Sequence, residues 1–249
     1  MGMERYAGRV ALVTGASSGI GAAVVQALLR KGLTVVGLAR RVDRVKALEL
    51  KDAPGKLYAI QGDVSSEDSI LSAFKWIREK LSGVDILINN AGLGNGHDLT
   101  SGKTEEWKRI LDVNVLGLSI CTREAVQDML RRGVDDGFII HISSIAAHVP
   151  PLAPIISMYA ASKHAVKVLL EGLRKDLVAR KSKIRVGEVS PGSVRTEFAK
   201  NFPGVPADHY DKNPCLESED VAEAVVYMLS QNLRVQVHDI IVYPNGSRY

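Results

Sequence analysis

Short runs of apolar, mostly β-branched residues recur along this chain, and this repetition constrains the fold more than any other feature of the sequence. We predict strands at Arg9–Thr14, Thr34–Ala39, Lys56–Gln61, Asp85–Asn89, Gly137–Ile142, Ile184–Val189 and His238–Val242. Their near-continuous Val, Ile and Leu composition, without strict polar alternation, is typical of strands that are buried on both faces.

Segments with helical periodicity separate these runs. We predict helices at Ile20–Lys31, Val42–Lys51, Glu67–Leu81, Thr104–Arg132, Met158–Arg180 and Glu219–Gln231. Strand and helix thus alternate from end to end, and right-handed crossovers then require a parallel sheet with helices on both faces. The sequence predicts a doubly wound α/β fold, and because no shift in composition marks a boundary, one domain over residues 1–249.

One segment interrupts this regular pattern. Asn201–Leu216 contains three prolines and has no clear period. It is either a plain surface loop or a mobile flap over a ligand. Because it follows the sixth strand, at the edge of the sheet where such folds bind ligands, we predict a substrate flap around residues 196–216.

Composition excludes several classes of protein. The two cysteines, Cys121 and Cys215, have no CxxC or histidine-rich context, so we expect no metal site and no secreted disulfide scaffold. The N-terminal segment is too broken by Gly and Ser for a signal peptide, and no apolar run approaches the ~20 residues of a membrane span. We therefore expect a cytoplasmic protein. A net charge of +4 is too small to indicate nucleic-acid binding.

A glycine-rich turn follows the first predicted strand and leads directly into a helix. Gly15, Gly19 and Gly21 allow a tight turn and a close backbone approach, and the free N–H groups of the helix start attract a pyrophosphate. The alternative is a tight turn without a ligand. The position between a strand and a helix favours a nucleotide site.

Basic residues end the second predicted strand. In a dinucleotide-binding fold an acidic residue there would hold the ribose 2′-hydroxyl, whereas an arginine accepts a 2′-phosphate. Arg40 and Arg41 therefore favour NADP over NAD, with Arg40 as the main contact, while Arg44 is either a further contact or plain helix surface. Asp63, after the third strand, is either an acceptor for the adenine amino group or a helix-entry turn residue.

Tyr159 and Lys163 are four residues apart in a predicted helix and so face the same way. A nearby ammonium group is expected to lower the tyrosine pKa, which suits a group that exchanges a proton with an alcohol or a ketone. Ser144 closes the fifth strand, 15 residues before Tyr159, and is placed to donate to the substrate oxygen; the alternative is a cap or turn serine, and Ser143 is the weaker candidate.

Together these motifs resemble the short-chain dehydrogenase/reductase family. They are TGASSGIG, Asn89-Asn90-Ala91-Gly92, Asn114, the Ser144/Tyr159/Lys163 set and Pro191-Gly192, and they cover nearly the whole chain in the family's order. Several longer segments, among them VDILINNAGL and EDVAEAVVYMLS, resemble two subgroups, the insect farnesol dehydrogenases and the vertebrate family member eleven. The resemblance implies a Rossmann fold whose seven strands have the order 3-2-1-4-5-6-7.

The resemblance also implies a role for each matching residue. It assigns the catalytic roles to Asn114, Ser144, Tyr159 and Lys163, with Asn114 holding a water of a proton relay and Lys163 also binding the nicotinamide ribose. It places the cofactor against Gly15, Ser17, Ser18, Gly19, Ile20, Gly21, Asp63, Val64, Asn90, Ala91, Gly92, Pro191, Gly192, Val194 and Thr196, in addition to Arg40 and Arg41 at the end of the second strand.

The implied activity is the NADP(H)-dependent interconversion of an apolar alcohol and its aldehyde or ketone. The expected pocket walls, Ser144–Met158 and Asn201–Leu216, are rich in Pro, Ile, Leu, Val and Phe, and favour an apolar alcohol or ketone, either an isoprenoid such as farnesol or a steroid. With the resemblance to the farnesol dehydrogenases, we predict an isoprenoid alcohol. A ketosteroid or general carbonyl reductase is the alternative, and a non-catalytic NADP-binding scaffold a remote one. By the same analogy, the long helices pair between subunits in a homodimer or homotetramer.

Two features depart from the family pattern. His141 replaces an asparagine that commonly precedes the serine pair, and the stretch Pro150–Pro154 lengthens the spacing between Ser144 and Tyr159. The longer spacing fits the two subgroups and does not indicate inactivity. His148 lies in this stretch of chain, where it either contacts substrate or, as we expect, is an exposed loop histidine.

Overall fold

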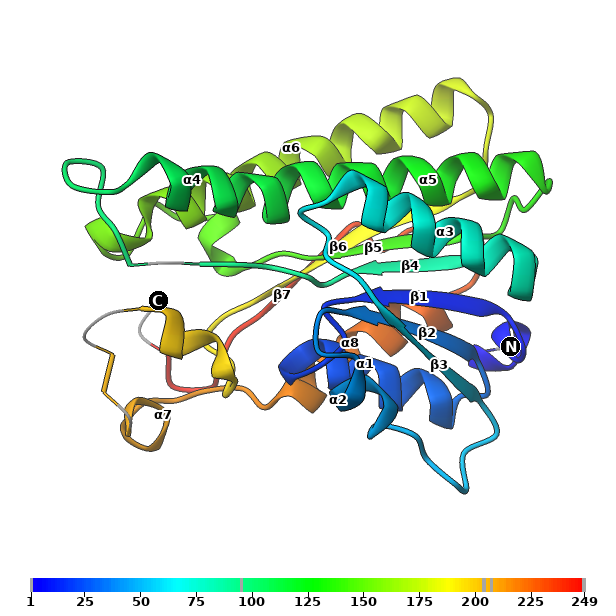
Figure 1. Ribbon diagram of the computed structural model, residues 1–249, viewed down its shortest axis with the longest axis horizontal. Coiled ribbons are helices and arrows are strands. Elements are labelled where there is room, and N and C mark those ends of the chain that lie inside the picture. Colours follow the sequence, from blue (N-terminus) through cyan, green and yellow to red (C-terminus); the bar gives the residue numbers. More distant parts are fainter. Residues whose placement is uncertain (1, 95, 203–204, 207, 248–249) are drawn as a thin grey trace.

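A parallel sheet forms the centre of the computed structural model, which describes residues 2–94, 96–202, 205–206 and 208–247 (Figure 1). Its strands are β1 (Val10–Thr14), β2 (Thr34–Ala39), β3 (Lys56–Gln61), β4 (Ile86–Asn89), β5 (Phe138–Ile142), β6 (Arg185–Pro191) and β7 (Asp239–Val242). They pair in the order β3-β2-β1-β4-β5-β6-β7, and each pair is parallel. The predicted fold class and strand order are confirmed.

Helices cover both faces of the sheet (Figure 1). One layer contains α1 (Gly19–Arg30), α2 (Val42–Lys46) and α8 (Ser218–Ser230), and the other contains α3 (Glu67–Leu81), α4 (Thr104–Leu111), α5 (Leu118–Arg131) and α6 (Ser157–Ala179). A short helix, α7, spans His209–Lys212, and 3₁₀ turns span Met3–Tyr6, Ile145–Ala147, Pro154–Ile156 and Glu197–Asn201. Each face of the sheet has its own apolar core, so alternate strand residues point to opposite layers.

Two predicted helices differ from those observed. The segment Thr104–Arg132 is not one α-helix, because a π-helical turn at Asp112–Gly117 separates α4 from α5. This turn brings Gly117 so close to the carbonyl oxygen of Val64 that a Cβ atom would not fit. The helix that begins at Val42 ends at Lys46, and Leu48 and Leu50 beyond it pack onto the core beside α1.

The ends of the predicted flap meet at its base. Val194 and Leu216 form an isolated parallel bridge, in which Arg195 N donates to Leu216 O over 2.8 Å. The segment between them contains the 3₁₀ turn Glu197–Asn201 and α7, so it is less irregular than its sequence predicts. Residues 203, 204 and 207 of the predicted flap lie outside the described residues. None of the described helices has both the length and the hydrophobicity needed to cross a membrane.

Candidate active site

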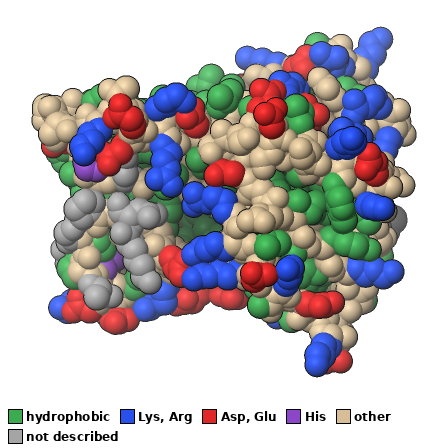
Figure 2. Space-filling view, viewed as in Figure 1, with side chains coloured by type: hydrophobic (Ala, Val, Ile, Leu, Met, Phe, Trp, Pro, Cys, Tyr) green, Lys and Arg blue, Asp and Glu red, His purple; other side chains and the backbone are tan. Residues whose placement is uncertain are grey.

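A cavity of about 1010 Å³ opens at the carboxyl ends of the strands. Figure 2 shows the hollow, with apolar side chains at its floor and charged side chains around its rim. The cavity is lined by nearly all of the predicted site residues, namely Gly15, Ser17, Ser18, Gly19, Ile20, Arg40, Arg41, Asp63, Val64, Asn90, Ala91, Gly92, Ser144, Tyr159, Lys163, Pro191, Gly192, Val194 and Thr196. Gly21 and Asn114 are not among its lining residues.

The glycine-rich turn is tightly packed against the end of β4. Gly15 has a φ of +65°, and a Cβ there would lie 2.8 Å from the Cα of Ala91. Asn90 Nδ2 donates to the carbonyl oxygens of Thr14 (2.9 Å) and Gly15 (3.2 Å). Ser18, the N-cap of α1, makes no side-chain cap hydrogen bond. The start of α1 therefore presents backbone N–H groups to the cavity, an arrangement that suits a phosphate.

Three arginines surround the rim beside this turn. Arg40 and Arg41 are both exposed, and Arg41 donates to the Ser18 hydroxyl (3.0 Å). Arg41 and Arg44 both form ion pairs with Glu197, each at 3.1 Å, and their hydrogen bonds lower the pKa of that carboxyl group. Arg44 therefore faces Glu197 across the rim rather than being plain helix surface. Sequence reasoning missed Glu197, because nothing local indicates that it crosses to β2.

Asp63 is a helix-entry turn residue that also lines the cavity, and its contact with the adenine amino group stays a prediction. Its Oδ1 accepts from the Ser65 backbone (2.9 Å) and hydroxyl (2.8 Å), as expected of a helix-entry turn, and the residue also lines the cavity. Burial alone would raise the pKa of Asp63, but the bonds from Ser65 and the charges of Arg40 and Arg109 hold it below its usual value. Arg109 of α4, which the sequence reasoning missed, lines the same end of the cavity.

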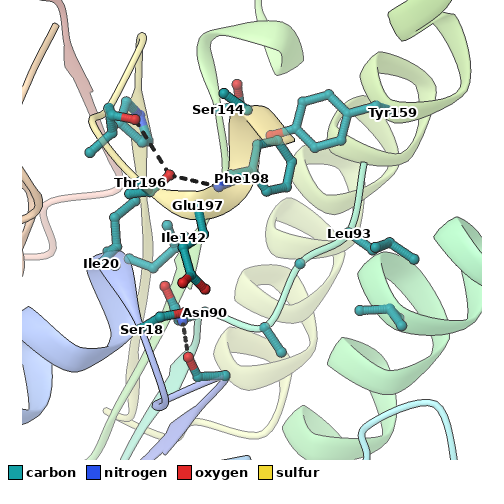
Figure 3. Close-up of a pocket in the computed structure, with 18 of the residues that line it drawn as sticks. Ser18, Ile20, Asn90, Leu93, Ile142, Ser144, Tyr159, Thr196, Glu197 and Phe198 are labelled. Carbon is teal, nitrogen blue, oxygen red and sulfur yellow. Dashed lines mark hydrogen bonds between the residues drawn. The ribbon is translucent and has the colours of Figure 1, made fainter. Parts of the chain in front are cut away.

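Tyr159, Lys163 and Ser144 meet at the other end of the cavity. Tyr159 and Lys163 lie one turn apart on α6, with Lys163 Nζ 5.8 Å from the centre of the tyrosine ring. The Lys163 ammonium group is buried and donates to the carbonyl oxygen of Ile142 over 2.9 Å. Ser144 accepts from the Ala146 backbone over 3.1 Å, so it caps the following turn as well as facing Tyr159. Figure 3 shows Ser144 and Tyr159 at one end of the pocket, and Ser18 and Asn90 at the other.

The expected lowering of the Tyr159 pKa is wrong for this structure. Burial raises the pKa of Tyr159 to about 12, although a hydrogen bond with Ser144 opposes the shift. The rings of Phe198 and Phe202 pack 5.4 and 6.4 Å from the tyrosine ring and help to exclude water. Burial also lowers the pKa of Lys163 to about 8, since removal from water disfavours the ammonium form. Desolvation, which depends on the surrounding elements, thus raises the pKa of Tyr159 where the sequence predicted that it would fall.

Asn114 lies behind the cavity, in the π-helical turn. Its Nδ2 donates to Leu93 O (2.8 Å) and to Ser162 Oγ (2.9 Å), and its Oδ1 accepts from Leu93 N (2.7 Å). The buried side chain therefore joins the segment after β4 to α6. Its predicted role of holding a water stays a prediction.

Apolar side chains surround the space beside Tyr159. They include Leu93, Leu152, Ile155, Ile156, Phe198, Phe202 and Val205, which come from the loop after β4, the Pro150–Pro154 stretch, the turn that follows it and the flap. Lys212, in the second half of the flap, is not among the lining residues and pairs with Asp208 at 2.5 Å. The described wall near Tyr159 is therefore mainly apolar.

His141 and His148, the two histidines considered in the sequence, have distinct environments. His141 is buried, and desolvation lowers its pKa to about 3, so it is neutral. The expectation that His148 is an exposed loop residue is wrong: its side chain is only 11% exposed. His148 does not line the cavity, and its Nε2 lies 2.9 Å from Ser190 Oγ on β6. The close packing of its segment on α6 explains the difference.

Comparisons with known proteins agree with this geometry. A family model described as short chain dehydrogenase matches residues 9–204. The chain is 50% identical over 251 residues to "Dehydrogenase/reductase SDR family member 11" of Mus musculus, covering 98% of this chain and 96% of that protein. It is 45% identical over 251 residues to "Farnesol dehydrogenase" of Aedes aegypti, covering 99% and 100%.

A solved structure shows a similar fold over nearly the whole chain. It is an alcohol dehydrogenase of the archaeon Thermococcus sibiricus complexed with 5-hydroxy-NADP, with a TM-score of 0.85 and 28% sequence identity. The match covers 97% of this chain and 98% of that one.

Proposed function

The chain belongs to the short-chain dehydrogenase/reductase family of oxidoreductases that act on alcohols and carbonyls, and from that premise we propose that it is an NADP(H)-dependent enzyme for apolar substrates. The observation that carries the proposal is the common cavity: it is lined by Ser144, Tyr159 and Lys163 at one end and by the glycine-rich turn and Arg40 at the other. An apolar wall adjoins Tyr159.

Proton transfer in the proposed reaction belongs to Tyr159. Its phenol gives a proton to a carbonyl oxygen during reduction and takes one from the alcohol during oxidation. Ser144 donates to the same oxygen and so fixes its position. Lys163 supplies the positive charge that stabilises the phenolate form, and its burial strengthens that interaction.

The residues present fit a dinucleotide. The close approach of Gly15 to Ala91 leaves a cradle that a side chain would fill, and the start of α1 offers uncapped N–H groups. When bound, the nicotinamide supplies or accepts the hydride. Asn114, placed behind the site, is proposed to complete the proton relay.

NADP is the proposed form of the cofactor because the rim near β2 is cationic. Arg40 is exposed at the end of this strand, and the Glu197 carboxylate pairs with Arg41 and Arg44 beside it. A 2′-phosphate beside Arg40 would make the same kind of charge-assisted hydrogen bond that Arg41 and Arg44 make with this carboxylate. The similar archaeal enzyme binds a derivative of NADP, which supports the same choice.

An isoprenoid alcohol, or its aldehyde, is the proposed substrate. Phe198, Ile155 and Leu152 offer apolar surface close to Tyr159, and similarity to a farnesol dehydrogenase supports the choice. A steroid ketone is the rival. We further propose one domain whose flap spans 196–216, a cytoplasmic location, and a homodimer or homotetramer.

A chain-length series tests the proposal. The oxidation of C2–C15 alcohols and the reduction of the matching carbonyls and of a steroid ketone are followed by the absorbance of the reduced cofactor, with NADP and NAD in parallel. Each buried CH₂ contributes up to about 0.8 kcal/mol, so kcat/KM should rise with chain length until the pocket is full. A flat profile overturns the apolar substrate, and absence of turnover with both cofactors favours the non-catalytic scaffold.

A further inference from the structure

A fully buried carboxyl group lies in the sheet beneath the candidate active site. Glu188 is on β6, where Val186 and Ser190 share its face, and this face packs against the core under α3, α5 and α6. Its side chain is 0% exposed, and the Ser143 hydroxyl is the hydrogen-bonding group that acts on its carboxylate. Burying such a group is costly, so it requires a nearby group of opposite charge or a bound proton.

Titratable groups lie near Glu188 on β5, β7, α6 and the turn after β5. Its register neighbours are His141 on β5, which is neutral, and Asp239 on β7. Lys163 and Lys167 lie one turn apart on the α6 face above, and His148 Nε2 is 4.0 Å from Glu188 Oε1. Glu188 therefore has two ammonium groups as candidate partners.

Lys167 is already engaged by other side chains. Its Nζ lies 2.7 Å from His148 Nδ1 and 3.5 Å from Asp239 Oδ2. Because an ammonium group can only donate, His148 accepts at Nδ1 and carries its proton on Nε2. His148, Glu188 and Asp239 are close enough to hold a metal ion, within 4.8 Å of one another, but an Nε2 that carries a proton is not a ligand. Lys167 supplies the cation of this cluster.

Lys163 reaches the same part of the sheet: its Nζ donates over 2.9 Å to the carbonyl oxygen of Ile142, whose register partner on β6 is Val189, the neighbour of Glu188. Among the described residues, no carboxylate forms an ion pair with Lys163 within 4.0 Å. The carboxylate of Glu188 opposes the effect of burial and raises the pKa of Lys163. The hydrogen bond from Ser143 and the charges of Lys167 and Lys163 lower the pKa of Glu188. Burial and the charge of Asp239 still raise the pKa of Glu188 to about 7. Glu188 is thus the negatively charged group that acts on the Lys163 ammonium group.

We propose that Glu188 is a positioning residue that acts through Lys163: its buried carboxylate keeps the Lys163 ammonium group charged where Tyr159 exchanges its proton. This inference rests on the proposed function of Tyr159 and Lys163. Without the carboxylate, Lys163 loses its proton at a lower pH, and a neutral amine no longer stabilises the phenolate.

Titration of Lys163 itself tests the inference without turnover. The ¹³Cε chemical shift of Lys163, assigned through its loss in Lys163→Arg, is followed against pH in wild type, Glu188→Gln and Glu188→Ala. A buried opposite charge at close range shifts a pKa by about 1–3 units. We expect the midpoint to fall by about one pH unit in both variants and to recover in Glu188→Asp, which keeps the charge. Glu171→Gln removes a charge from the outer side of the same helix and is the matched control, with no expected change.

The pH profile of kcat/KM for alcohol oxidation gives the functional result. In Glu188→Gln we expect the alkaline loss of activity to begin about one pH unit lower, with Glu171→Gln unchanged. An unchanged Lys163 midpoint, or a uniform loss of activity with the same profile, overturns the role of Glu188. If the midpoint moves while the wild type turns over no substrate, the charge coupling stands and the proposed function fails.

Discussion

Replacing Arg40 with alanine gives the sharpest test of cofactor choice, because the change breaks no hydrogen bond or ion pair that the Arg40 side chain makes within the described residues. Arg40 is exposed at the end of β2, and in the described part of the chain its guanidinium group makes no hydrogen bond or ion pair. Arg41→Ala, by contrast, would also release Ser18 and Glu197. An effect of Arg40→Ala therefore reports its contact with the cofactor rather than a change in the fold.

The expected size of the effect follows from the chemistry of the contact. A hydrogen bond between charged groups contributes about 1.5–3 kcal/mol, which corresponds to about a ten- to hundredfold rise in the KM for NADP. Since Arg40 is exposed, solvent screening places the result near tenfold, and added salt should reduce it further. The KM for NAD should change little, because NAD has no 2′-phosphate.

The assay compares KM and kcat for both cofactors with one alcohol substrate at two salt concentrations. Arg30→Ala, which removes an exposed arginine at the far end of α1, is the control and should change neither cofactor's KM. A wild type that prefers NAD, or an Arg40→Ala variant that weakens both cofactors equally, would refute the assignment of Arg40.

Three further predictions concern the buried end of the site. Tyr159→Phe removes only a hydroxyl group, so we expect a native melting temperature and a ~10²–10⁴-fold fall in kcat; most of the activity remaining would contradict its role. Lys163→Ala should lower kcat and raise the KM for the cofactor together, and an effect on one alone would separate its two proposed roles. Because the pKa of Glu188 is raised to about 7, the folded protein should lose up to about 3 kcal/mol of stability as the pH rises from about 4.5 to 7, and Glu188→Gln should lose this dependence in chemical denaturation. If the stability of the wild type and of Glu188→Gln depends on pH in the same way, the raised pKa of Glu188 is refuted.

Local patterns in the sequence predicted the framework. Runs such as Val10–Thr14 and Phe138–Ile142 are strands within one residue of their predicted bounds, since an apolar β-branched run is stable only between two covered faces. The glycine turn and the pair Tyr159 and Lys163 were equally readable, because both depend on spacing within one element. The single long helix over Thr104–Arg132 was wrong, because its π-helical turn depends on the close approach of Gly117 to Val64.

Contacts between residues that are far apart in the sequence could be seen only in the tertiary structure. Glu197 reaches Arg41 over 156 positions of sequence, and the burial of His148 depends on its contacts with Ser190 and Lys167. The pKa values of Tyr159 and Lys163 also depend on the tertiary structure. The two side chains lie one turn apart in any helix that contains them, but burial by the surrounding elements shifts the pKa of each. Periodicity and spacing concern residues of one helix or strand, so the elements and motifs that they define can be predicted from the sequence. Desolvation and charge coupling depend on residues that only folding brings together.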